Sequence, residues 1–106
     1  MAGKYAKEAT PKQVQDRLDQ GEQLYMLDVR EEEEWHGGHI AGANHIPLGQ
    51  LGQRMTELNA DRELIVICRS GNRSGLACEL LEANGFNVVN MAGGMLEWAG
   101  PVTYGQ

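Results

Sequence analysis

Short runs of apolar residues recur along the chain, separated by segments whose apolar positions follow a helical period. The runs 23–29 (QLYMLDV), 64–68 (LIVIC) and 86–90 (FNVVN) are rich in aliphatic and β-branched side chains, which is typical of buried strands. The segment 44–47 (NHIP) predicts one more, brief strand. Strands that alternate with helices over short connections form parallel sheets covered on both faces, so the pattern predicts an α/β fold with one open parallel sheet.

The first predicted helix carries its own start and stop signals. Thr10 can cap the helix, Pro11 fits its first turn, and Gln13 can reach back to complete a capping box. Gly21 is placed to end it.

Further helices are expected between the strands. A short acidic helix follows the strand 23–29, a weakly amphipathic helix covers 48–58, and a helix over 74–85 follows the strand 64–68. The chain closes with a turn at 93–98 (GGMLEW). A chain of 106 residues is expected to form one domain over its whole length, residues 1–106.

The composition is that of an ordinary globular chain, with 42% apolar and 23% charged residues. No apolar run approaches the ~20 residues that span a bilayer, and residues 1–12 lack the apolar centre of a secretory signal. We therefore expect a cytoplasmic protein. The formal net charge of −6 argues against nucleic acid or an anionic membrane as a partner.

The two cysteines, Cys68 and Cys78, lie ten positions apart across one predicted strand-to-helix junction. A bridge between them would not staple distant parts of the fold, and free thiols suit a reducing compartment. If residues 74, 77, 78 and 81 form the buried side of the helix, Cys78 is buried, as expected of a free cysteine. A buried side formed by residues 76, 80 and 83 turns Cys78 outward instead, which keeps a resolving role open.

Cys68 is the strongest candidate for chemistry, because it ends a buried strand and a helix follows within a few residues. Amides at the start of a helix lack backbone partners, so the loop can direct several N–H groups at the sulfur. Lowering a cysteine pKa by about two units takes roughly 2.7 kcal/mol, which a few such hydrogen bonds provide. The sequence therefore predicts an activated cysteine that needs no histidine base. The expected loop residues are Arg69, Ser70, Gly71, Asn72, Arg73 and Ser74.

Ligand sites of open parallel sheets lie at the carboxyl ends of the strands. Asp28 and Arg30 fall at this edge, and the turn 90–94 can approach it. Asp28 and Arg30 have two interpretations, namely ion pairing that holds the rim together or direct contact with substrate. Arg30 can also pair with Glu33 or Glu34. The expected supporting rim comprises Asp28, Arg30, Gly93, Gly94 and Met95.

Three ordered segments resemble those of rhodaneses, the sulfurtransferases that carry sulfur as a cysteine persulfide. CRSGNRS (68–74) resembles their active-site loop, LDVREEEEWHGGHIAGANHIP (27–47) their Asp-Val-Arg and Gly-His-Ile segments, and GGMLEW (93–98) their closing turn. The resemblance covers nearly the whole chain and departs at Trp35, where the family commonly has tyrosine. It implies a rhodanese-like fold with no metal and no organic cofactor.

The resemblance also implies a ping-pong thiosulfate sulfurtransferase. Cys68 takes sulfane sulfur from thiosulfate or a persulfide donor and passes it to a thiol or cyanide, while Arg69 and Arg73 draw in the anionic donor. A persulfide relay that serves a partner protein uses the same loop and stays open. A non-catalytic binding module is the remaining alternative, although such relatives usually lack the cysteine.

Other kinds of site are less well matched. Cysteine phosphatases and arsenate reductases place an arginine six positions after their cysteine, whereas Arg73 comes five after Cys68. A loop shorter by roughly 3.5 Å suits one sulfur atom and crowds a phosphate. The histidines of 36–45 are interrupted by glycines, which disfavours a metal site at His36, His39 and His45. The run Glu31 to Glu34 is interpreted as a solvated helical turn.

Overall fold

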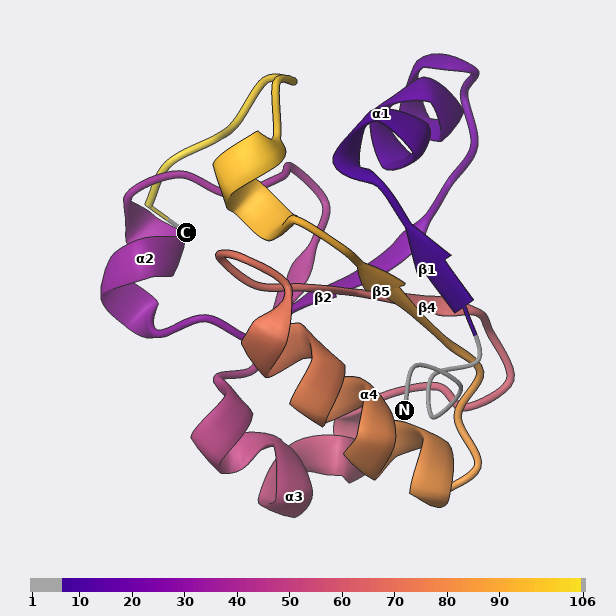
Figure 1. Ribbon diagram of the computed structural model, residues 1–106. Helices are drawn as coiled ribbons and strands as arrows, with labels where there is room; N and C mark the ends of the chain where they lie inside the picture. The colour runs from indigo at the N-terminus through magenta and orange to yellow at the C-terminus, as the bar shows by residue number, and fades with distance from the viewer. Residues whose placement is uncertain (1–6, 106) are drawn as a thin grey trace.

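The structure, a computed structural model, describes residues 7–105. One sheet lies at its centre, and its strands are β1 (Lys7–Ala9), β2 (Tyr25–Asp28), β3 (Asn44–His45), β4 (Leu64–Ile67) and β5 (Val88–Met91). The order across the sheet is β1-β5-β4-β2-β3, and every neighbouring pair is parallel. The predicted open parallel sheet is confirmed (Figure 1).

Helices cover both faces of this sheet, as predicted. The helix α1 (Pro11–Asp19) and the 3₁₀ turn η4 (Gly94–Glu97) lie on one face, and α3 (Leu51–Arg54) and α4 (Asn72–Ala83) lie on the other (Figure 1). The short helix α2 (Glu32–His36) follows β2 and lies beside the loop that leads from β4 into α4 (Figure 1).

The alternation of side chains along β4 decides on which face of the sheet Cys68 lies. All four residues of this strand are fully buried, and they alternate between the two faces of the sheet. Leu64 and Val66 pack into the core under α3 and α4, whereas Ile65 and Ile67 pack into the core under α1. Cys68 continues the alternation and lies in the core on the α4 side.

The first helix forms as the sequence predicts. The Gln13 amide donates to Oγ1 of Thr10 at 3.1 Å, and the Thr10 amide donates to Oε1 of Gln13 at 2.8 Å, which completes the capping box. Val14 is fully buried against the sheet. The helix therefore has both a local start signal and an apolar side to bury.

The predicted helix over 48–58 is wrong as one element. The segment divides into the 3₁₀ turn η2 (Leu48–Gln50), the single turn α3, and the 3₁₀ turn η3 (Met55–Glu57). Gly49 and Gly52 each cost a helix about 1 kcal/mol relative to alanine, which weakens a segment that has few apolar positions. The expected apolar side is still present, because its leucines and methionine pack against the core.

Other boundaries also differ from the prediction. β1 was not predicted, because Lys7–Ala9 has no strand pattern and is held as an edge strand by pairing with β5. β5 begins at Val88 and ends at Met91, so it is displaced from the expected 86–90. α4 begins at Asn72, two residues before the expected start, because Gly71 already forms its N-cap.

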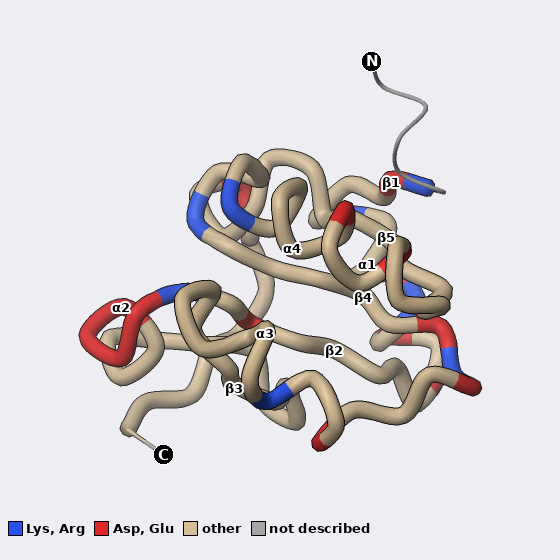
Figure 2. The backbone as a smooth tube through the Cα atoms, turned by 90° about the horizontal axis from the view of Figure 1, so that it is seen from below, with Lys and Arg blue, Asp and Glu red and all other residues tan. Residues whose placement is uncertain are grey.

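Charge is distributed unevenly over the chain. Acidic residues gather on α2, and arginines lie on the neighbouring loop before α4 and in the first turn of α4 (Figure 2). Within residues 7–105, no helix has the length and apolar content needed to cross a bilayer. The expectation about a leader concerns residues 1–12, of which 1–6 lie outside the described part of the chain.

Candidate active site

Cys68 directly follows β4, and α4 begins only four residues later. The first helical hydrogen bond runs from the Gly75 amide to the Gly71 carbonyl at 3.1 Å. The chain must therefore turn back at once, which brings the start of the helix to the sulfur. The cysteine is 0% exposed, so the loop and helix enclose it completely.

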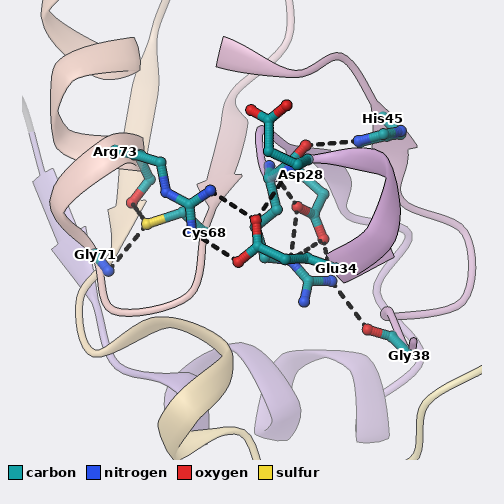
Figure 3. A network of polar contacts seen from close by, with 10 residues as sticks. Asp28, Glu34, Gly38, His45, Cys68, Gly71 and Arg73 are labelled. Carbon is teal, nitrogen blue, oxygen red and sulfur yellow. Dashed lines mark hydrogen bonds and ion pairs between the residues drawn. The ribbon is translucent and has the colours of Figure 1, made fainter. Parts of the chain in front are cut away.

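Two groups of the loop contact the sulfur. The Gly71 amide donates a hydrogen bond to Sγ of Cys68 at 3.0 Å, and the thiol donates to Oγ of Ser74 at 3.3 Å. Figure 3 shows the Gly71 amide and the sulfur directed at each other across the turn. The predicted arrangement of loop amides facing Cys68 is confirmed at Gly71.

The pKa of Cys68 reflects two opposed effects. Burial raises the pKa of the thiol, because a buried thiolate loses its hydration. The Ser74 hydroxyl and the Gly71 amide, which hydrogen-bond the sulfur, lower the pKa, and the amides of Ser74 and Ser70 act in the same direction. The hydrogen bonds outweigh the burial, so the pKa lies below the ordinary thiol value of 9.0. A buried cysteine that ionises readily has the character of a nucleophile.

Two glycines make this turn possible. Gly71 has φ of +102°, a left-handed conformation that residues with a side chain disfavour. Gly94 has φ of +60°, and a Cβ there would lie 2.5 Å from the carbonyl oxygens of Cys68 and Arg69. The backbone of η4 therefore packs directly against the back of the loop.

The η4 turn holds the loop through its carbonyl groups. The Met95 amide donates to the Cys68 carbonyl at 2.9 Å, and the Leu96 amide donates to the Arg69 carbonyl at 2.9 Å. With these carbonyls bound from behind, the loop amides are left to face the sulfur. Gly94 and Met95 thus act here through their backbone. Gly93 forms the N-cap of η4 with its amide close to Gly71, and the Met95 side chain packs into the core under α1.

Asn90 belongs to the site although the sequence analysis did not select it. It is 4% exposed, and its Oδ1 accepts the Ser74 hydroxyl at 2.6 Å while its Nδ2 donates to the Gly71 carbonyl at 3.3 Å. One side chain thus ties both sulfur-contacting residues to β5. The available signal was a polar residue near the carboxyl end of an otherwise apolar strand.

Arg73 is held by an acidic partner. Its Nη1 and Nη2 donate to Oε1 and Oε2 of Glu34 at 2.7 and 2.9 Å, and the two side chains face each other in Figure 3. The Arg73 hydrogen bonds lower the pKa of Glu34 to about 2, against an opposing effect of burial. Glu34 is therefore an exception to the solvated acidic turn that the sequence predicted, whereas Glu31, Glu32 and Glu33 are exposed.

The other loop side chains lie at the surface. Arg69, Ser70 and Asn72 are exposed, and the Arg69 guanidinium has no hydrogen bond or ion pair with any residue of 7–105. Ser70 acts on Cys68 through its amide. Arg69 is thus exposed and without a partner among residues 7–105, whereas Arg73 is paired with Glu34 and only partly exposed.

Asp28 and Arg30 form a buried ion pair. They are 1% and 6% exposed, and Arg30 donates to both carboxylate oxygens of Asp28, with the shortest distance, 2.7 Å, from Nη2. Nη2 of Arg30 also donates to the Gly38 carbonyl at 2.9 Å. The alternative partners Glu33 and Glu34 make no hydrogen bond or ion pair with Arg30, which pairs with Asp28 instead. The geometry favours the structural interpretation of this pair.

The histidines have structural partners. His39 and His45 stack on Trp35 with ring centroids 3.4 and 4.7 Å away, and each binds a backbone carbonyl. His36 binds the Gly105 carbonyl. Among residues 7–105, no three histidine, cysteine or acidic side chains are grouped closely enough to hold a metal ion.

Cys78 is buried, as the first of the two helical registers predicts. It is 0% exposed with Ser74, Ala77 and Leu81 on the inner side of α4, while Leu76 is 57% exposed on the outer side. Burial raises the pKa of Cys78 to about 12, and the nearby charges of Glu82, Cys68 and Glu8 act in the same direction. The two thiols of one helix junction therefore differ sharply in acidity.

A surface hollow lies away from Cys68. It has a volume of about 450 Å³ and lies between α1 and the segment 97–101, with no residue of the loop 68–74 in its lining. The hydrogen bonds to the sulfur and the lowered thiol pKa are found at the loop instead.

Comparison with known proteins gives a consistent result. Residues 10–101 match the sequence profile of the rhodanese-like domain. A Bacillus subtilis (strain 168) protein named "Putative sulfurtransferase YtwF" is 42% identical over 94 residues, which cover 89% of this chain and 91% of that protein. Another from the same organism, "Putative sulfur carrier protein YrkF", is 45% identical over 85 residues, which cover 79% of this chain and 46% of that protein.

A solved structure supports the same assignment. The crystal structure of a rhodanese-like domain protein from Staphylococcus aureus matches with a TM-score of 0.87 at 30% identity. The match covers 94% of this chain and 99% of that one, which leaves little of either fold outside the comparison. Sequence and structure agree, and the chain belongs to the rhodanese-like domain family.

Proposed function

We propose that the protein is a sulfurtransferase that moves sulfane sulfur through a persulfide on Cys68. The observation that carries the proposal is the buried sulfur at a helix start, which accepts the Gly71 amide at 3.0 Å and has a lowered thiol pKa. The family and the sulfurtransferase name of a relative that the chain covers almost fully support the same chemistry.

The proposed reaction has two half-reactions. The Cys68 thiolate attacks the outer sulfur of thiosulfate, a new S–S bond forms, and the S–S bond of thiosulfate breaks with its electron pair leaving on sulfite. A thiolate or cyanide then attacks the outer sulfur of the persulfide, and the Cys68 thiolate leaves unchanged. The loop amides stabilise the negative charge in both states, and the exposed Arg69 attracts the anionic donor.

The enclosure of the sulfur supports sulfur transfer over phosphate chemistry. Cys68 is 0% exposed. Its sulfur is hydrogen-bonded to the Gly71 amide and the Ser74 hydroxyl. A loop of this size suits a single added atom, whereas a tetrahedral phosphate needs a wider ring of donors. We therefore place phosphate or arsenate chemistry second to sulfur transfer.

A persulfide relay is a second candidate function. The sulfur carrier name of one relative favours it, and the chain covers about half of that relative. In this role a partner protein supplies or accepts the sulfur, with the same Cys68 intermediate. The free, buried thiols of Cys68 and Cys78 suit the reducing cytoplasm, which is where we propose that the protein works.

A coupled assay tests the enzymatic proposal. The wild type and Cys68→Ser are compared for thiocyanate formation from thiosulfate and cyanide, with an aryl phosphate ester tested in parallel. We expect thiocyanate formation by the wild type alone and no phosphate release. Steady phosphate release that is lost in Cys68→Ser would instead assign the loop to phosphate chemistry.

A further inference from the structure

Glu34 is fixed in place at both of its carboxylate oxygens. Besides the two hydrogen bonds from Arg73, its Oε1 accepts the Glu31 amide at 2.9 Å, which completes a capping box at the start of α2. The Glu34 and Arg73 side chains are only 28% and 31% exposed. A two-pronged, partly buried pair of this kind holds a defined geometry. The Arg73 guanidinium therefore already has a carboxylate bound to both of its terminal nitrogens.

The pairing changes the charge that a substrate meets. Three arginines lie near the carboxyl ends of β2 and β4, and two of them are neutralised, Arg30 by Asp28 and Arg73 by Glu34. Arg69 is the one of these three arginines that has no acidic partner among the described residues. The exposed carboxylates of Glu31, Glu32 and Glu33 lie on the same turn as Glu34. A site built to attract a dianion would leave its second loop arginine unpaired.

We propose that Glu34 is a specificity-determining residue, which cancels the charge of Arg73 and so disfavours dianionic sulfur donors relative to donors of lower charge. The inference rests on the proposed function and narrows its donor class to persulfides or thiosulfonates that carry at most one negative charge. Thiosulfate remains a substrate, but a poor one. Arg73 still interacts with the Cys68 thiolate, whose charge contributes to holding the guanidinium protonated.

Two donors separate the effect of charge from the effect of size. Thiosulfate and methanethiosulfonate both present an outer sulfur to the thiolate, and they release sulfite and methanesulfinate, respectively. They differ chiefly in a methyl group in place of one anionic oxygen, which changes the net charge from −2 to −1. A carboxylate near the site repels the first about twice as strongly as the second.

The test compares kcat/KM for both donors in the wild type and in Glu34→Gln, with cyanide as acceptor. For charges about 8 Å apart in an effective dielectric of about 60, loss of the carboxylate raises kcat/KM about tenfold for thiosulfate and about threefold for methanethiosulfonate. The preference for thiosulfate thus rises about threefold. The difference shrinks in 1 M salt, where the screening length falls to about 3 Å.

Two further variants serve as controls. Glu33→Gln removes the same charge from an exposed position on α2 that has no contact with Arg73, and we expect less than a twofold change in the donor preference. Glu34→Asp keeps the charge with a shorter side chain and retains the wild-type preference. Urea unfolding of each variant checks that the fold is intact.

The outcomes are distinct. An unchanged donor preference in Glu34→Gln, or an equal shift in Glu33→Gln, would overturn the role of Glu34 while leaving sulfur transfer by Cys68 in place. If Glu34→Asp behaves as Glu34→Gln does, the residue acts through geometry and the charge argument is wrong. If the wild type uses neither donor, the proposed function itself fails and this inference fails with it.

Discussion

The Oγ atom of Ser74 lies 3.3 Å from Sγ of Cys68, in the first turn of the helix that begins behind the sulfur. In the thiol state the S–H group donates to Ser74, and the Ser74 hydroxyl donates to Asn90. When the thiol ionises, the same hydroxyl can turn and donate to the thiolate. Ser74 therefore favours the charged form, and Asn90 keeps it in position for this exchange.

Replacement of Ser74 tests this contribution. In Ser74→Ala the thiolate loses one hydrogen bond, so we expect the pKa of Cys68 to rise by about one unit, equivalent to about 1.4 kcal/mol. The pH dependence of the alkylation rate of Cys68 reports this pKa. Ser70→Ala is the matched control, because Ser70 acts through its amide, which the substitution keeps. If the alkylation rate has the same midpoint pH in the wild type and in Ser74→Ala, the hydroxyl does not stabilise the thiolate.

The two cysteines should react at very different rates. Both thiols are 0% exposed, but burial raises the pKa of Cys78 to about 12, so at pH 8 it is a neutral thiol in the folded protein, whereas the loop lowers the pKa of Cys68. We expect iodoacetamide to modify Cys68 in the native state and Cys78 only after urea unfolding. Peptide mass mapping of partly labelled protein measures both rates. Labelling of Cys78 at the rate of Cys68 would contradict the packing of α4.

The Glu34–Arg73 pair makes stability depend on pH in the acid range. The pKa of Glu34 is lowered to about 2, so its contribution is fully present above its ordinary value of 4.5 and is lost as pH falls toward 2. Because the pair is partly exposed, we expect Glu34→Gln to lower the free energy of unfolding at pH 7 by about 1–2 kcal/mol.

Urea unfolding at several pH values measures this dependence. The difference between the wild type and Glu34→Gln should narrow below pH 4.5 and be lost as the pH falls through about 2. Glu57→Gln removes the exposed pair with Arg54 and should have a much smaller effect. A constant difference between the wild type and Glu34→Gln across the whole range would show that the loss arises from packing alone.

Gly94 should tolerate no side chain. A Cβ at this position meets the backbone of the Cys68 loop at 2.5 Å, and φ of +60° adds strain, so we expect Gly94→Ala to cost about 2 kcal/mol or more of stability and most of the sulfur transfer. Gly52→Ala is the control, because Gly52 is exposed on α3 with open space around it and a helical alanine is favoured there. A Gly94→Ala protein with unchanged unfolding and turnover would show that η4 does not support the loop.

Local signals explain what could be predicted from the sequence. The capping box of Thr10 depends on residues three positions apart, and the burial of β4 follows from four consecutive apolar side chains. The turn at Cys68 follows from a buried strand, a glycine and a helix in close succession. These features need no knowledge of distant contacts, and the structure contains all of them.

The remaining features depend on partners that lie far apart in the sequence. Arg73 binds Glu34, 39 residues away, and Ser74 donates to Asn90, 16 residues away. These contacts form because the fold brings α2 and β5 to the loop. Arg30 has several acidic neighbours in the sequence, and it pairs with Asp28 because of the way the backbone turns at the end of β2. The edge strand Lys7–Ala9 likewise exists through its pairing with β5. No local pattern carries this information.

Intact mass spectrometry can show whether Cys68 holds sulfur. The protein is incubated with thiosulfate or methanethiosulfonate, freed of donor, and compared with Cys68→Ser treated in the same way. We predict that the wild type gains the mass of one sulfur atom, that cyanide removes it, and that Cys68→Ser gains nothing. A wild-type mass that stays unchanged with both donors, or an equal gain in Cys68→Ser, would contradict a sulfur-carrying Cys68.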